Sequence, residues 1–189
     1  MASHVLADRL HGLEASPTLA LAAKAKALAK AGKPIVDLTA GEPDFPTPEP
    51  IKQAAIQALR QGKTKYTPVG GIPELKDAIR EKLKRDNGLD YSREEILVSV
   101  GGKHALYNAC AALLDPGDEV IIPAPYWVSY PDQVLLNDAR PVVLQTREED
   151  GFLVDPEALE KAITRRTKMI ILKLKLHRLS KRIKSQIAD

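Results

Sequence analysis

The sequence predicts an α/β fold in which helices flank a largely parallel sheet. Stretches with helical spacing of apolar residues alternate with short apolar runs, and the runs at residues 142–144 (VVL) and 169–172 (MIIL) have the continuous apolar character of strands covered on both faces. The chain has 189 residues, and 44% of them are hydrophobic. This is enough for one domain of ordinary size with an apolar core.

Three helices and two strands are expected in the first part of the chain. Proline near the first helical position and glycine after the last one mark the helix ends, with apolar residues at helical spacing between them. A short run rich in β-branched residues predicts each strand. The expected elements are helices over residues 17–31, 47–62 and 73–87, strands over residues 35–39 and 96–100, and a loop over residues 63–72.

Three more helices are expected to alternate with three more strands in the remaining chain. The turn Asp115-Pro116-Gly117-Asp118 separates the first of these helices from the strand that follows, and Asp155-Pro156 opens the last helix. The expected elements are helices over residues 103–114, over residues 128–136 and from residue 155 onward, and strands over residues 119–123, 141–145 and 169–172.

The positive charge of the chain is concentrated at its end. The formal net charge is +3, but residues 173–189 carry six basic side chains and one acidic side chain, which leaves 22 basic and 24 acidic side chains elsewhere. A hypothesis of binding to nucleic acid or to an anionic membrane therefore rests on these residues alone. We expect neither partner for the body of the protein.

The remaining composition predicts a cytoplasmic protein without a metal site. The single cysteine, Cys110, cannot form an internal disulfide, and the four histidines are too scattered to predict a metal site. No apolar run reaches the length of a membrane span, and the N-terminal stretch has no continuous apolar region of the signal-peptide kind.

A predicted strand, a Gly-Gly pair and a predicted helix follow one another in the stretch VSVGGKHALYNA, residues 98–109. Glycine lets the backbone approach a ligand closely, and the first turn of a helix offers free N–H groups at the positive end of its dipole, so Gly101 and Gly102 indicate an anion site. The alternative is a tight turn that binds nothing. Leu97 and His104 stand where a Walker A loop needs Gly and Ser or Thr, which excludes that motif.

Two further stretches follow predicted strands at the end of the sheet where ligands bind in parallel α/β folds. They are GEPDFPTP, residues 41–48, and PYWVSYP, residues 125–131. Read singly, the first is a proline-stiffened connection and the second an ordinary aromatic anchor. Beside an anion site, however, Trp127, the only tryptophan of the chain, offers a plate for a planar aromatic ligand. A phosphate together with a flat ring indicates pyridoxal 5'-phosphate.

Several motifs, in order and with their spacing, resemble the class I, fold-type I aminotransferases, especially the aspartate aminotransferase branch. They are AGEPDF, GKTKYTPVGGIPELKDAI, VSVGGKHALYNA and LDPGDEVIIPAPYWVSYPD, and the resemblance runs from about residue 16 to residue 172. It implies a partial fold type I transferase fold whose C-terminal half is missing. It also implies transfer of an amino group from aspartate or a related amino acid to a 2-oxo acid by means of pyridoxal 5'-phosphate.

The resemblance further implies which residues bind the cofactor. Backbone N–H groups of Gly102 and Lys103 would bind its phosphate, with Gly101 shaping the turn, and Trp127 would stack on the pyridine ring. Tyr66 would reach the phosphate of the neighbouring subunit's cofactor, because these enzymes share active sites across a homodimer. Taken alone, Tyr66 would be interpreted as an aromatic residue of a surface loop.

The substrate-binding residues implied by the resemblance are Gly41, Thr18, Lys103 and Trp127. Gly41 would present its backbone to the α-carboxylate, while Lys103 and Thr18 would lie near the side-chain carboxylate of a dicarboxylic substrate, whose desolvation a cation offsets. The alternative for Lys103 is a solvated lysine. A cation is unfavourable at the positive end of a helix dipole, which favours the ligand role.

No catalytic residue is expected in this chain. The resemblance places the Schiff-base lysine, the aspartate that pairs with the pyridine nitrogen, the Asn-Pro-x-Gly segment and the C-terminal arginine in sequence beyond residue 172, where this chain has none of these motifs. Lys181 follows a serine, but no Gly-x-Arg-x-Gly follows it, and we interpret it as a chance match. We therefore expect a truncated chain that is inactive alone.

The expected organisation has three parts. Residues 1–46 form an N-terminal helix, strand and substrate loop, residues 47–172 an incomplete cofactor-binding α/β domain, and residues 173–189 a basic tail of unrelated, frameshifted or fused origin. Two alternative functions stay open. One is a non-catalytic module that binds the cofactor or a phosphate or pairs with another subunit, and the other is a polyanion or membrane binder that acts through the tail.

Overall fold

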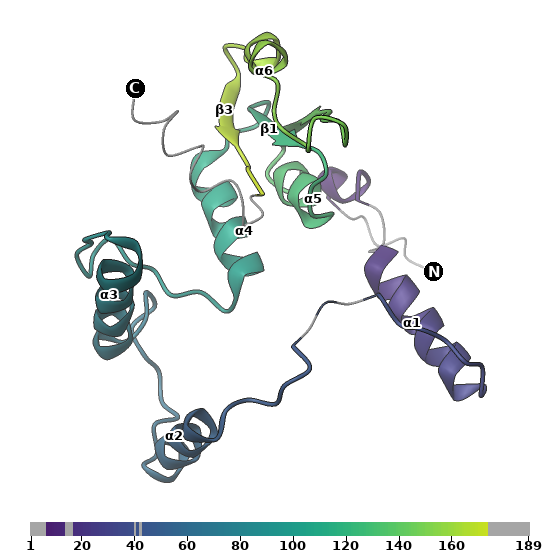
Figure 1. Ribbon diagram of the computed structural model, residues 1–189. Helices are drawn as coiled ribbons and strands as arrows, with labels where there is room; N and C mark the ends of the chain where they lie inside the picture. The colour runs from purple at the N-terminus through teal and green to yellow at the C-terminus, as the bar shows by residue number, and fades with distance from the viewer. Residues whose placement is uncertain (1–6, 14–16, 40, 42, 174–189) are drawn as a thin grey trace. The chain divides into compact units, whose positions relative to one another are not determined.

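The computed structural model of the protein describes residues 7–13, 17–39, 41 and 43–173 (Figure 1). Apart from its first residue, the predicted basic tail lies outside this described part, as does Lys181. The chain divides into two units, one made of residues 1–14 and 102–189 and the other of residues 15–101.

A three-stranded parallel sheet forms the centre of the unit that contains residues 102–173. The strand order is β2-β1-β3, with β1 (Glu119–Pro123) between β2 (Arg140–Leu144) and β3 (Thr167–Ile170). Both pairings of β1 are parallel. This sheet confirms the predicted fold class, and β1 has the predicted bounds.

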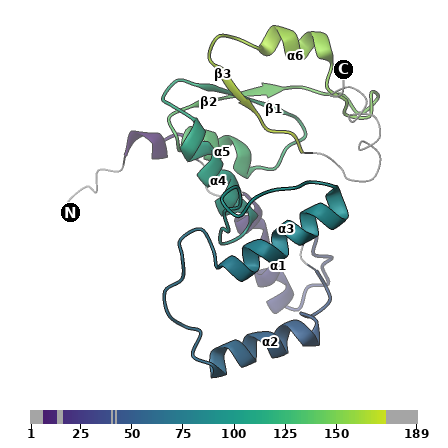
Figure 2. The same cartoon turned by 90° about the vertical axis from the view of Figure 1, so that its left-hand side faces the viewer.

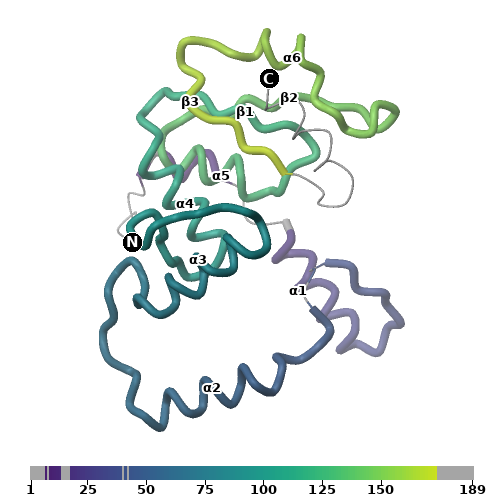
Figure 3. Tube along the Cα trace, turned by 60° about the vertical axis from the view of Figure 1, so that its left-hand side comes forward, coloured from purple at the N-terminus to yellow at the C-terminus, as the bar shows by residue number. Residues whose placement is uncertain are grey.

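Helices cover both faces of this sheet. Figures 2 and 3 show α6 on one face and α4 with α5 on the other. The start of α6 follows from its cap, because the Asp155 side chain accepts a hydrogen bond from the Glu157 N–H at 3.2 Å. The helices of this unit are the 3-10 helix η1 (Asp8–Leu10), α4 (Gly102–Leu113), α5 (Ser129–Leu135) and α6 (Pro156–Ala162).

The apolar core of this unit is built around the central strand. Val120 and Ile122 pack in one cluster with Cys110 of α4 and Val134 of α5. Ile121 points to the opposite face, since side chains alternate along a strand. Val120, Ile121 and Ile122 each have an exposed fraction of 0%. Because helices lie on both faces, β1 is buried on both, as its continuous apolar sequence predicts.

A buried carboxylate joins the amino-terminal ends of the three strands. Glu119, at the start of β1, accepts a hydrogen bond from Arg140 Nη2 at 2.5 Å and another from Thr164 Oγ1 at 2.8 Å. Arg140 begins β2, and Thr164 lies shortly before β3. These two hydrogen bonds lower the pKa of Glu119 below its ordinary value, with the Arg140 contact as the larger cause. These contacts lie at the opposite end of β1 from the loop that contains Trp127.

The described part of the unit of residues 15–101 consists of helices and extended segments. Its third helix has the predicted bounds and ends at Gly88, whose φ of 69° lies in the left-handed region. Asp77 of that helix accepts hydrogen bonds from Arg80 and from Arg93, and Arg80 Nε donates to the Tyr91 carbonyl at 2.5 Å, which fastens the following segment to the helix. The helices are α1 (Pro17–Lys30), α2 (Glu49–Arg60) and α3 (Pro73–Asn87).

Two predicted strands are wrong. Residues 35–39 and 96–100 are not part of any strand, and all strands among the described residues belong to the other unit. Leu38 is 89% exposed, while Val98 makes a backbone hydrogen bond from its N–H to the Gly70 carbonyl at 3.0 Å. β-branched residues favour a strand only where a neighbouring strand and a buried face are available. No neighbouring strand pairs with either segment, although Ile96 is buried.

Candidate functional site

The helix α4 is followed by a tight turn and then by β1, so that the end of α4 is next to the start of β1. Because the helix packs back along the sheet, its first turn lies toward the carboxyl-terminal end of β1 (Figure 2). Gly101 has a φ of 93°, a left-handed value that glycine adopts without strain, and Gly102 begins the helix. The N–H groups of Gly102 and Lys103 have no partner within the helix, since the first four N–H groups of an α-helix precede its hydrogen-bond pattern. This turn can therefore donate hydrogen bonds to an anion.

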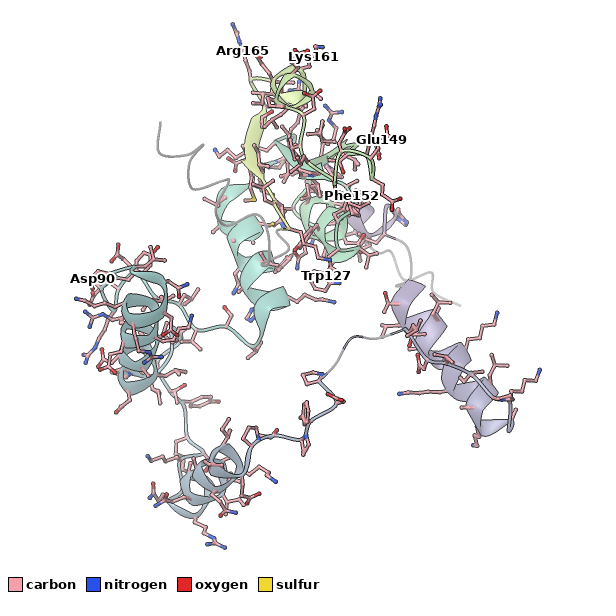
Figure 4. All side chains as sticks on the ribbon, viewed as in Figure 1. Asp90, Trp127, Glu149, Phe152, Lys161 and Arg165 are labelled. Carbon is pink, nitrogen blue, oxygen red and sulfur yellow. The ribbon has the colours of Figure 1, made fainter. Side chains whose placement is uncertain are left out.

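Trp127, labelled in Figure 4, lies in the loop that joins β1 to α5. The end of β2 holds this loop, because the Ala124 N–H donates to the Leu144 carbonyl at 2.9 Å and the Thr146 hydroxyl donates to the Ala124 carbonyl. The half-buried indole meets the Tyr130 ring edge-on, with 5.7 Å between the ring centroids. These contacts orient the aromatic plate.

The structure brings Lys103 and Trp127 together. The Lys103 Nζ lies 4.7 Å from the centroid of the Trp127 ring, a cation–π contact. The contact is worth about 0.5–1 kcal/mol for an exposed lysine, and it offsets the unfavourable position of a cation at the positive end of a helix. Two residues predicted for one site from different parts of the sequence are thus in direct contact.

Gln133 is a residue of this site that the sequence analysis missed. Its side chain is buried, and its Nε2 donates a hydrogen bond to the Lys103 carbonyl at 2.9 Å. A glutamine inside a predicted amphipathic helix carries no motif. The available signal is its spacing from Tyr130 and Val134, which places a polar side chain on the apolar face of α5.

The other predicted site residues belong to the unit of residues 15–101. Thr18 is the second residue of α1 and is exposed, and Gly41 is exposed as well. Tyr66 is fully exposed in the segment between α2 and α3. The roles of all the predicted site residues, those in both units, stay predictions.

The described residues do not point to another kind of site. Cys110 is buried in α4, and burial raises the pKa of its thiol, which keeps it in the less nucleophilic protonated form. Within the described ranges there is no group of three or more His, Cys, Asp or Glu side chains that could hold a metal ion. None of the helices in the described ranges is long and apolar enough to cross a membrane.

A comparison with protein families decides the ancestry of the chain. Residues 33–173 match the family described as "Aminotransferase class I and II". The chain belongs to this family. The matched range includes all of the sheet and the Lys103–Trp127 contact, so the geometry described above is that of a class I and II aminotransferase chain.

Relatives of known function are aminotransferases too, and the chain spans less than half of their length. It is 55% identical over 167 residues to the aspartate/prephenate aminotransferase of Nitrosomonas europaea. This matched stretch covers 88% of this chain and 42% of the relative. It is 54% identical over 167 residues to the aspartate aminotransferase of Geobacillus stearothermophilus, with 88% and 42% covered.

Solved structures of aspartate aminotransferases share the fold. The enzyme from Rhizobium meliloti matches with a TM-score of 0.84 and 49% identity, covering 90% of this chain and 42% of that one. The Thermus thermophilus enzyme with maleate matches with a TM-score of 0.86 and 51% identity, covering 90% and 44%. The aminotransferase chain thus has the fold that the resemblance implies, over the portion predicted from its motifs.

Enzymes of this family depend on pyridoxal 5'-phosphate, and two features of this aminotransferase chain fit that cofactor. The first turn of α4 offers N–H donors of the kind that bind a phosphate. The Trp127 indole, held by its loop, offers a face on which a pyridine ring can stack. Gly102, Lys103 and Trp127 are the residues of the described structure that would hold the group.

Proposed function

We propose that this chain provides the phosphate- and ring-binding part of an aspartate aminotransferase-type enzyme. Such an enzyme transfers the amino group of aspartate or a related amino acid to a 2-oxo acid. The observation that carries the proposal is the contact between Lys103 at the start of α4 and Trp127 after β1, with Nζ 4.7 Å from the ring centroid. It places a helix N-terminus, a cation and an aromatic plate at one end of the sheet.

The roles of the residues follow from their chemistry. The N–H groups of Gly102 and Lys103 donate hydrogen bonds to the cofactor phosphate, and Gly101 shapes the turn before them. Trp127 stacks on the pyridine ring and limits the access of water to one of its faces. When bound, the cofactor supplies an electron sink for the carbon that carries the amino group.

The remaining predicted residues complete the proposal for the substrate. The backbone of Gly41 binds its α-carboxylate, and the Lys103 ammonium with the Thr18 hydroxyl binds the second carboxylate of a dicarboxylic substrate. Tyr66 binds the cofactor phosphate of a partner subunit in a homodimer. We propose the cytoplasm as the location of the protein. We keep the proposed division of the chain into three parts, with boundaries after residues 46 and 172.

We further propose that these 189 residues do not complete the transfer by themselves. The reaction needs a lysine that holds the cofactor aldehyde and moves the α-proton, together with an arginine for the α-carboxylate. The 189 residues contain neither an Asn-Pro-x-Gly segment nor a Gly-x-Arg-x-Gly segment of the kind that accompanies those groups. We therefore expect cofactor binding without turnover.

Titration of the 189-residue protein with pyridoxal 5'-phosphate tests the proposal, because Trp127 is its only tryptophan and its emission reports on the site alone. Pyridoxal, which lacks the phosphate, is the matched control. We expect quenching by both, with at least about tenfold tighter binding of the phosphorylated form, since each hydrogen bond to a charged group contributes about 1.5–3 kcal/mol.

Two results would contradict this assignment. Equal affinity for pyridoxal and its phosphate would show that the first turn of α4 does not bind the phosphate. Steady transfer of the amino group from aspartate to 2-oxoglutarate by the purified 189-residue protein would show that it needs no further sequence.

A further inference from the structure

We propose that Gln133 is a positioning residue that holds the first turn of α4 in place for anion binding. The inference rests on the proposed function of that turn. It adds a residue of this chain whose role comes from a contact between two helices. The same contact places the phosphate-binding turn relative to the aromatic plate.

The geometry joins the two halves of the site through one residue. Gln133 Nε2 donates to the backbone carbonyl of Lys103 at 2.9 Å, while the ammonium of the same lysine lies over Trp127 at 4.7 Å from the ring centroid. Gln133 and Trp127 are six residues apart, on α5 and on the loop that leads into it. Lys103 is therefore attached at both its backbone and its side chain to one short segment of chain.

The hydrogen bond to a backbone atom matters for the direction of the N–H groups. The Lys103 carbonyl belongs to the peptide plane between Lys103 and His104, and the two planes before it carry the N–H groups of Lys103 and Gly102, the proposed phosphate donors. Holding this carbonyl therefore limits the rotation of the planes that precede it in the first turn. A helix end without such a contact frays and loses the orientation of its donors. Preorganised donors bind a ligand more tightly because less conformational freedom is lost on binding.

Gln133 is a poor choice for stability alone. Its side chain is buried, but its Oε1 has no hydrogen-bond partner among the described residues. A buried polar atom without a partner offsets the gain from the bond made by the other half of the amide. A methionine of similar shape would fill the same space without this loss. The buried amide is thus explained by the Lys103 carbonyl that it holds.

The test compares Gln133→Met with the matched control Asn137→Ala in the full chain. Asn137 Nδ2 donates to the Gln133 carbonyl at 2.8 Å, so the control also removes an amide-to-carbonyl bond near α5 but leaves α4 untouched. Three quantities are measured: the thermal midpoint, the amide exchange of Leu106 and Tyr107 without ligand, and the affinity for inorganic phosphate and pyridoxal 5'-phosphate from Trp127 emission. In the pattern of an α-helix, the Leu106 N–H bonds to the carbonyl of residue 102 and the Tyr107 N–H to the carbonyl of residue 103, so their exchange reports on the first turn.

For Gln133→Met we expect an unchanged or higher thermal midpoint, faster exchange at Leu106 and Tyr107, and about two- to tenfold weaker binding of both anions, the range for the loss of one neutral hydrogen bond. A residue that only stabilises the fold would lower the midpoint and leave the affinity of the folded protein unchanged. The control is expected to leave exchange and affinity within about twofold of the unaltered chain.

The outcomes separate this inference from the proposed function. Unchanged exchange in Gln133→Met would overturn the positioning role whatever the ligand result, and so would unchanged affinity in a chain that binds phosphate. If the unaltered chain binds neither anion while Gln133→Met still exchanges faster, the positioning of the turn is supported and the cofactor-binding function fails.

Discussion

The contact between Lys103 and Trp127 can be measured by a double-mutant cycle. The perturbations are Lys103→Met, which removes the ammonium but keeps a side chain of similar length, Trp127→Leu, and the two together. At 4.7 Å from the ring centroid and with an exposed lysine, the cation–π contact is worth about 0.5–1 kcal/mol. The lysine also lies at the positive end of α4, which costs about 0.3–1 kcal/mol.

These two effects have opposite signs in the single variant. Lys103→Met loses the ring contact and gains relief from the helix dipole, so we expect its free energy of unfolding to stay within about 0.5 kcal/mol of the unaltered chain. The cycle cancels the dipole effect, because that effect is present with or without the indole. The coupling between the two residues should therefore equal the ring contact alone, about 0.5–1 kcal/mol.

The assay is urea unfolding followed by far-ultraviolet circular dichroism, because Trp127 is itself altered and cannot serve as the probe. Lys103→Arg is the control, since a guanidinium keeps the charge and stacks on an aromatic face. Coupling below about 0.2 kcal/mol would show that the ammonium and the ring do not interact in solution. Loss of more than about 1 kcal/mol in Lys103→Met alone would show that the lysine stabilises the unit in another way.

Two further predictions concern the sheet. In the same urea titration, Ile121→Ala should lower the free energy of unfolding by about 2–5 kcal/mol, because the Ile121 side chain has an exposed fraction of 0%. The control Ile163→Ala changes a side chain that is 52% exposed and should lower it by less than about 1 kcal/mol. Equal losses in the two variants would contradict the assigned core. Because Arg140 and Thr164 lower the pKa of Glu119, its contribution to stability is full above the ordinary glutamate pKa and is lost as the pH falls through the lowered value. Unfolding midpoints taken from neutral to acidic pH should therefore show the unaltered chain losing its advantage over Glu119→Gln as the pH falls, and a constant difference would refute the role of the carboxylate.

Much of the local structure follows from local signals. Pro73 and Gly88 delimit α3 at the predicted residues, because a proline fits the first helical position and a glycine adopts the left-handed conformation after the last one. The strand β1 has its predicted bounds because a continuous apolar run between turns needs cover on both faces. These conditions are contained in a few neighbouring residues.

The segments of residues 35–39 and 96–100 show where such signals fail. Both have the composition of strands, and neither is a strand, since the hydrogen bonds of a strand must be made with residues distant in sequence. Composition indicates that a segment can pair. It does not supply the partner.

The candidate site divides in the same way. The sequence alone determined the family, a helix directly after the Gly-Gly pair, an aromatic residue at position 127 and the presence of a lysine beside the glycines, because each of these is a local motif at a recognisable spacing. Only the tertiary structure decided that the Lys103 ammonium lies over the indole and that Gln133 holds the Lys103 carbonyl. Both contacts join residues at least 24 positions apart in the sequence, and they exist only because α4 and α5 pack on the same face of the sheet, which brings the start of one helix against the side of the other.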